Sequence, residues 1–108
     1  MDIVQRFLNY TKINTTTNRA AGAAGIMPSN PKELELADLI KGELEALGIK
    51  NISLSEKSIL IAKIPSNLDA PAPRVAFFAH LDTSAEQSSD TKAQIVRYEG
   101  GDICLNKE

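Results

Sequence analysis

The sequence predicts an α/β domain with a mixed β-sheet whose covering layer of helices is incomplete. Two stretches have apolar residues at helical spacing, and three or four shorter stretches have strand patterns. The most apolar stretch, residues 74–79, is typical of a strand buried on both faces, which needs helices above and below the sheet. No helical pattern follows residue 80. We therefore expect residues 1–108 to be the N-terminal portion of a larger domain.

The first helix is expected over residues 2–12, where Asp2 is a suitable N-cap. Its apolar side chains share one face at helical spacing: Ile3, Val4, Phe7 and Leu8. Residues 14–30 are rich in Asn, Thr, Ala and Gly and show no periodic pattern. They predict a flexible loop that is long for a compact domain.

The second helix has the clearest start and stop signals. Asn30 is placed as the N-cap, Pro31 at the first helical position, and Glu33 three residues after the cap. Gly48 is expected to end the helix, because glycine adopts the left-handed conformation that follows many helices. The apolar stripe between these signals consists of Leu36, Ile40, Leu44 and Leu47.

Strands are expected at four places after this helix. Residues 52–55 and 58–64 are separated by a tight turn and predict a hairpin. A polar, proline-rich connection leads to the apolar strand 74–79, whose sequence is Arg-Val-Ala-Phe-Phe-Ala. Residues 93–98 form a further strand candidate, and Gly100-Gly101 marks a turn.

The composition excludes several classes of protein. Hydrophobic residues make up 43% and charged residues 24%, as in an ordinary soluble domain. The net charge is −2 with scattered Lys and Arg, which disfavours binding to nucleic acid. No apolar stretch approaches the ~20 residues that cross a bilayer, and the start lacks a secretory signal pattern. The single cysteine, Cys104, has no partner for an internal disulfide, which fits a cytoplasmic protein.

The residues that point to chemistry are His80 and Asp82. His80 is the only histidine and directly follows the apolar strand, at the edge where α/β sheets collect ligands. Neutral imidazole is a good zinc ligand, and a carboxylate can accept a hydrogen bond from the other ring N–H and so orient the ring. Residues i and i+2 of an extended segment face the same side. The spacing alone leaves two interpretations open: a metal site, or an ordinary histidine at a strand end.

The segment around this histidine resembles a known family. Residues 77–84, Phe-Phe-Ala-His-Leu-Asp-Thr-Ser, resemble the first metal-site motif of the peptidase T family of bacterial tripeptide aminopeptidases, which are co-catalytic zinc exopeptidases. The resemblance continues along nearly the whole chain, in order and at similar spacing. The further matching segments are residues 6–10, 54–57 with Leu60, Ala62 and Pro65, 94–96 with Tyr98, and 100–103.

The resemblance implies a cytoplasmic metallopeptidase that releases the N-terminal residue from tripeptides by means of zinc-activated water. It makes His80 a ligand of one of two zinc ions, and it makes Asp82 the catalytic carboxylate that orients and polarises that ligand. The family's remaining ligands and its general base follow downstream of this motif. We therefore expect residues 1–108, as the N-terminal portion of the catalytic domain, to be inactive by themselves.

A second interpretation is a non-catalytic α/β module that binds a partner or oligomerises. An uncovered apolar sheet face favours self-association, so a homo-oligomer is expected in that case. The two interpretations differ in whether further metal ligands follow this segment in the whole protein.

Overall fold

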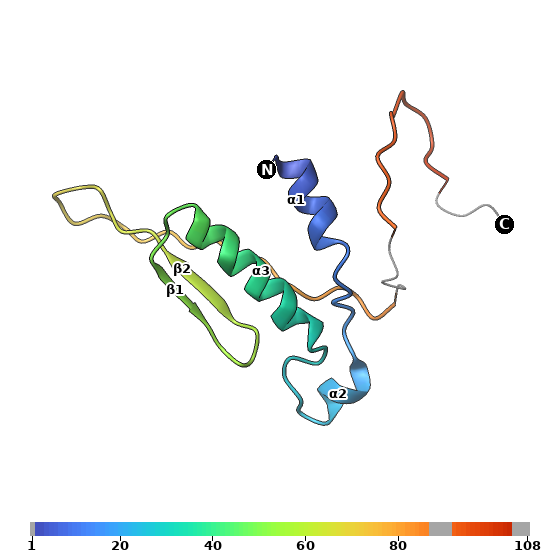
Figure 1. The fold of residues 1–108 in the computed structure, drawn as a ribbon, viewed down its shortest axis with the longest axis horizontal. Coiled ribbons are helices and arrows are strands. Elements are labelled where there is room, and N and C mark those ends of the chain that lie inside the picture. The colour runs from blue at the N-terminus through green and yellow to red at the C-terminus, as the bar shows by residue number, and fades with distance from the viewer. Residues whose placement is uncertain (1, 87–91, 105–108) are drawn as a thin grey trace.

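The computed structural model describes residues 2–86 and 92–104, and its centre is a helix packed on a β-hairpin (Figure 1). The three helices are α1 (Ile3–Tyr10), α2 (Arg19–Ala23) and α3 (Lys32–Ala46). The two strands are β1 (Asn51–Leu54) and β2 (Leu60–Lys63). Helix α3 contacts both strands. The expected second helix and hairpin are confirmed, with boundaries shifted by one or two residues.

The contacts expected at both ends of α3 are present, although the helix begins at Lys32 and Pro31 occupies the cap position, one residue later than predicted. The Asn30 side chain accepts a hydrogen bond from the Lys32 N–H at 3.0 Å, and the Glu33 carboxylate accepts one from the Asn30 N–H at 3.2 Å. At the other end, Gly48 has a φ of 85° and donates its N–H to the Glu45 carbonyl at 2.9 Å. These contacts satisfy backbone groups that a helix end otherwise leaves unpaired.

The hairpin is antiparallel and forms one small apolar layer with α3. Its register places Ile52 opposite Ala62 and Leu54 opposite Leu60. The most buried apolar residues of the described chain lie on α3, where Ala37 is fully buried and Leu36 is 7% exposed. This core is small, because it consists of one helix packed on a sheet of only two strands.

The predicted strand 74–79 and the mixed sheet are wrong for the described residues. The segment is irregular, and Phe77 and Phe78 are 95% and 94% exposed. Residues 93–98, the other strand candidate, are also irregular and exposed. A strand needs a backbone partner, and no described residue forms a ladder with either segment. The apolar sequence of residues 74–79 predicted a buried strand, but no other described residues cover this segment.

Helix α1 was predicted correctly, yet its apolar face is open to solvent. Asp2 caps the helix by accepting a hydrogen bond from the Gln5 N–H at 2.8 Å. Phe7 is mostly exposed, and so is Ile3. The side of α1 that touches α3 is polar instead: the Tyr10 hydroxyl donates to Glu43 Oε2 at 2.5 Å.

The described chain is extended as a whole. Its radius of gyration is 17.6 Å, compared with about 13 Å for a compact domain of this length. Figure 1 shows why, because residues 92–104 lie apart from the helices and the hairpin. Within the described parts of the chain, no helix combines the length and the apolar character needed to cross a membrane.

Candidate functional site

Two segments far apart in the sequence meet beside the N-terminal end of α3. The Thr17 N–H donates to the Thr83 carbonyl, and the Thr83 N–H donates to the Thr15 carbonyl, both at 3.0 Å. These bonds form a single parallel bridge between Thr16 and Thr83. Thr15 is buried, with 3% of its surface exposed, whereas Thr83 is exposed. The predicted loop 14–30 thus contains the helix α2 and also holds the segment that follows His80.

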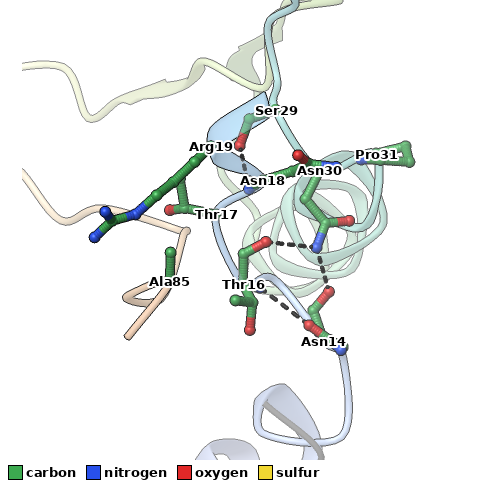
Figure 2. Close-up of a pocket in the computed structure, with 9 residues that line it drawn as sticks. All are labelled: Asn14, Thr16, Thr17, Asn18, Arg19, Ser29, Asn30, Pro31 and Ala85. Carbon is green, nitrogen blue, oxygen red and sulfur yellow. Dashed lines mark hydrogen bonds between the residues drawn. The ribbon is translucent and has the colours of Figure 1, made fainter. Parts of the chain in front are cut away.

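The side chain of Asn30 fixes the loop on its other side (Figure 2). Its amide group donates to the carbonyls of Asn14 and Thr16, each at 2.9 Å. The side-chain oxygen of the same residue accepts a hydrogen bond from the Lys32 N–H at the start of α3. A second contact, from the Asn18 N–H to Ser29 Oγ at 3.1 Å, closes the loop above it. The start of α3 therefore determines where residues 14–18 lie.

The imidazole of His80 points one nitrogen at Asp82. Nδ1 lies 2.7 Å from the Asp82 carbonyl oxygen and 3.2 Å from Asp82 Oδ1. A carbonyl and an ionised carboxylate can only accept, so Nδ1 is assigned as the protonated nitrogen of the neutral ring. Nε2 then carries the lone pair. The side chain of His80 is 83% exposed, so the ring is accessible to a ligand.

Asp82 is held from two directions. Its Oδ1 faces His80, whereas its Oδ2 accepts a hydrogen bond from the Thr17 hydroxyl at 2.7 Å. The Thr17 bond is the main reason why the pKa of Asp82 lies below its usual range, and the His80 contacts act in the same direction while partial burial opposes them. Asp82 is therefore ionised at neutral pH, as a hydrogen-bond acceptor for an imidazole N–H must be.

Two open cavities lie near this group. The larger, of about 590 Å³, is lined mostly by polar side chains of the loop and the start of α3, including Asn14, Asn18 and Asn30 (Figure 2). The smaller, of about 260 Å³, is lined by both Thr17 and Asp82. His80 lines neither cavity. Hydrogen-bond geometry therefore identifies the site better than cavity size does.

The donor set fits one part of a zinc site. An imidazole with a free lone pair on Nε2 and a carboxylate on its Nδ1 is the arrangement that orients many zinc-ligating histidines. Zinc in proteins needs three or four protein ligands. Among residues 2–86 and 92–104, no three His, Cys, Asp or Glu side chains are grouped so as to hold a metal ion. The described chain thus offers one imidazole with a carboxylate beside its Nδ1, and no complete set of metal ligands.

The structure brings together the two residues that the sequence singled out, and it adds a third. Residues 80 and 82 were paired on the basis of their i, i+2 spacing, and their side chains do meet. Thr17 was missed, because it lies 65 residues before Asp82 in a segment to which no role was assigned. The only signal available was the density of hydroxyl and amide side chains in residues 14–18, which does not name a partner.

Comparison with known proteins gives consistent matches over the whole chain. The chain is 40% identical over 109 residues to a peptidase T from Parabacteroides distasonis, an alignment that covers 100% of the chain and 26% of the relative. It is 42% identical over 105 residues to a peptidase T from Fusobacterium nucleatum, covering 96% of the chain and 25% of the relative. A peptidase T from Halothermothrix orenii is 40% identical over 107 residues, which cover 97% of the chain and 26% of the relative.

These alignments share one property: the chain spans about a quarter of the length of the curated relatives that it matches. No protein-family model matches the chain. The similarity therefore extends over nearly the whole of the present chain but over only about a quarter of each peptidase T.

Proposed function

Because the chain is, over its whole length, a homologue of about a quarter of peptidase T, we propose that the whole protein to which it belongs is a zinc-dependent aminopeptidase. In this proposal the protein is cytoplasmic and releases the N-terminal residue from tripeptides. Residues 1–108 contribute the first part of its metal site and have no activity by themselves. The sequence identity of about 40% over 100% of the chain supports the peptidase class. Zinc and the tripeptide substrate are inferred from the resemblance to the peptidase T family, which includes the metal-site motif at residues 77–84.

The observation that carries the proposal is the orientation of the His80 ring. Its Nδ1 faces two acceptors on Asp82, so Nε2 is left with its lone pair and is accessible to a metal ion. A carboxylate in this position makes the imidazole a stronger ligand and prevents the ring from rotating.

Within the proposed site each residue has one role. His80 would ligate zinc through Nε2, and Asp82 would hold the ring and its proton at Nδ1. Zinc, when bound, supplies a Lewis acid and lowers the pKa of a bound water towards neutrality. The other ligands and the general base would come from parts of the whole protein beyond residues 1–108.

The test uses the full-length protein with three substitutions. His80→Ala is expected to reduce the bound zinc per protein molecule and to abolish measurable tripeptide hydrolysis. Asp82→Asn is expected to lower zinc affinity or activity by about 10- to 100-fold, the usual effect of losing such an orienting carboxylate. Asp69→Asn, in the exposed connection after β2, serves as a control and should change neither.

Zinc content measured by atomic emission and peptide hydrolysis measured by chromatography give separate readouts. If His80→Ala retains full zinc and full activity, the assignment of His80 as a ligand is wrong. If the unsubstituted full-length protein binds no zinc, the non-catalytic module becomes the better proposal. The exposed Phe77 and Phe78 would then be its association surface.

A further inference from the structure

The two oxygens of the Asp82 carboxylate have different partners. Oδ1 lies 3.2 Å from His80 Nδ1, and Oδ2 lies 2.7 Å from the Thr17 hydroxyl. His80 Nδ1 has a second and nearer acceptor in the Asp82 carbonyl oxygen, at 2.7 Å. A carboxylate with only one partner can rotate about its terminal bond, since that torsion has a broad energy minimum. A second hydrogen bond to the other oxygen fixes the plane of the group. The hydroxyl of Thr17 therefore restricts the direction in which Asp82 presents Oδ1 to the histidine.

Thr17 itself is held firmly enough to do this. Its own N–H is bonded to the Thr83 carbonyl, and the preceding carbonyl of Thr16 accepts from the Asn30 amide. The hydroxyl also lies 3.0 Å from the Thr83 carbonyl oxygen, so two acceptors are within reach of one proton. The Asp82 carboxylate is the nearer of the two and is charged, and charge-assisted bonds are about twice as strong as neutral ones. The proton is thus directed to Asp82.

We propose that Thr17 is a positioning residue, which holds the Asp82 carboxylate in the plane where Oδ1 joins the Asp82 carbonyl oxygen as an acceptor for His80 Nδ1, and so helps to keep the imidazole in its Nδ1–H tautomer and correctly oriented. The inference rests on the proposed function insofar as the ring it orients is a metal ligand. It adds a residue that lies 65 positions before Asp82 in the sequence and that contacts Asp82 through its hydroxyl. Thr17 acts through Asp82 and does not itself touch the ligand nitrogen.

The neighbouring Thr16 provides a matched control. Its hydroxyl lies 3.4 Å from the Thr83 hydroxyl, and Asp82 is not among its hydrogen-bond partners. Its backbone carbonyl accepts from Asn30, and a change of side chain leaves that carbonyl in place. Thr16→Val and Thr17→Val therefore remove the same hydroxyl group from adjacent residues, but only the second removes a bond to Asp82. Thr17→Ser keeps the hydroxyl and serves as the rescue variant.

The first experiment needs no metal and no activity. His80 is the only histidine of the 108-residue chain, so nitrogen-15 NMR of that chain at a pH where the ring is neutral reports a single imidazole. The unsubstituted chain is expected to show mainly the Nδ1–H tautomer. Thr17→Val should raise the population of the Nε2–H tautomer several-fold, whereas Thr16→Val and Thr17→Ser should leave it unchanged. An identical tautomer ratio in the Thr17→Val chain would overturn the inference.

The second experiment uses the full-length protein with zinc. Thr17→Val is expected to weaken zinc binding and to lower kcat by about 10-fold, the lower end of the effect of losing an orienting partner, with little change in KM. Thr17→Ser should restore both values. Equal losses in Thr17→Val and Thr17→Ser, or loss of the folded state in Thr17→Val, would assign the hydroxyl a purely structural role and overturn the inference.

The two proposals fail in different ways. If the unsubstituted full-length protein binds no zinc and hydrolyses no tripeptide, the proposed function fails, while the tautomer measurement on the chain still tests the Thr17 contact. If His80→Ala keeps its zinc and activity, the assignment of His80 as a ligand fails, and with it the functional meaning of the Thr17 contact. If His80→Ala is inactive while Thr17→Val equals the unsubstituted protein in tautomer ratio, zinc affinity and kcat, only the positioning role of Thr17 is wrong.

Discussion

The contact between α1 and α3 allows a quantitative test by titration. The Tyr10 hydroxyl donates to Glu43 Oε2 at 2.5 Å, and Arg6 Nε lies 2.7 Å from the same oxygen. The Arg6 N–H is not aligned for a hydrogen bond, so its contact is an ion pair only. Partial burial, followed by the hydrogen bond to Glu43 and the charge of Glu43, raises the pKa of Tyr10 from 10.0 to about 12, against the opposing charge of Arg6.

The perturbation is Glu43→Gln, which removes the carboxylate charge and keeps the size of the side chain. Because burial is the largest cause and persists in this variant, the pKa of Tyr10 should fall only part of the way from about 12 towards 10. A pKa that is raised on folding stabilises the protonated folded state. This stabilisation is fully present below pH 10 and is lost as the pH rises through about 12. The site is partly open to water, so we expect the contact to contribute about 1 kcal/mol.

The assay is the ultraviolet absorbance of phenolate as a function of pH. The chain has two tyrosines and no tryptophan, so Tyr98→Phe leaves Tyr10 as the only titrating phenol. Glu45→Gln in the same background is the control, because Glu45 lies on α3 but pairs with Lys41. A Tyr10 that titrates at 10 in the Tyr98→Phe chain would refute the contact. A Glu43→Gln variant with an unchanged pKa would refute its attribution to Glu43.

Two further predictions concern the residues that position the site and its helix, and both are measured by urea unfolding followed by circular dichroism. Asn30→Asp keeps the helix-capping oxygen but removes the amide donors to Asn14 and Thr16, so the free energy of unfolding should fall by about 1–2 kcal/mol; an unchanged stability would show that the loop does not depend on them. Gly48→Ala should cost about 1 kcal/mol because of the φ of 85°, whereas Gly42→Ala, inside α3 with open space around its Cβ, should add about 0.5–1 kcal/mol. Shifts of the same sign would contradict this reasoning.

Elements that depend on neighbouring residues were predictable from the sequence. The start of α3 is determined by Asn30 and Glu33, three residues apart, and its end by Gly48. The hairpin likewise depends on a short turn, in which the Ser55 N–H bonds to the Ile59 carbonyl. Each of these signals acts within one or two turns of chain, so the residues that specify the element are also the residues that form it.

The predicted strand at residues 74–79 depends on residues outside its own segment. The apolar character of residues 74–79 indicates an environment, and the environment of a buried strand consists of other strands and helices. The described residues supply no ladder partner for it, and Phe77 therefore remains in solvent. The apolar pattern therefore indicates that residues 74–79 are suited to a buried position, but the described residues do not provide the neighbouring strands and helices that would bury them.

The contacts of the candidate site also differ in whether they could be predicted from the sequence. The His80–Asp82 contact follows from alternation along an extended segment, and i, i+2 spacing is visible in any sequence. The Thr17–Asp82 contact depends on the hydrogen bond from the Asn30 amide to the Thr16 carbonyl and on the bridge between Thr16 and Thr83. Neither interaction is indicated by a pattern of neighbouring residues in the sequence. A loop residue joins a site only when tertiary contacts place it there. Such contacts cannot be identified from a single sequence.

Orientation and affinity are separate properties of a metal ligand, and the described chain supplies mainly the first. Thr17 fixes the Asp82 carboxylate, and the carboxylate and carbonyl of Asp82 both face His80 Nδ1, so the lone pair on Nε2 is directed before any metal arrives. Affinity requires several ligands around one ion, and the described residues offer no such group. If this division is correct, the Thr17 hydroxyl affects the tautomer of the isolated chain and the zinc affinity of the whole protein through one and the same contact. The two measurements should therefore rank the variants at position 17 in the same order.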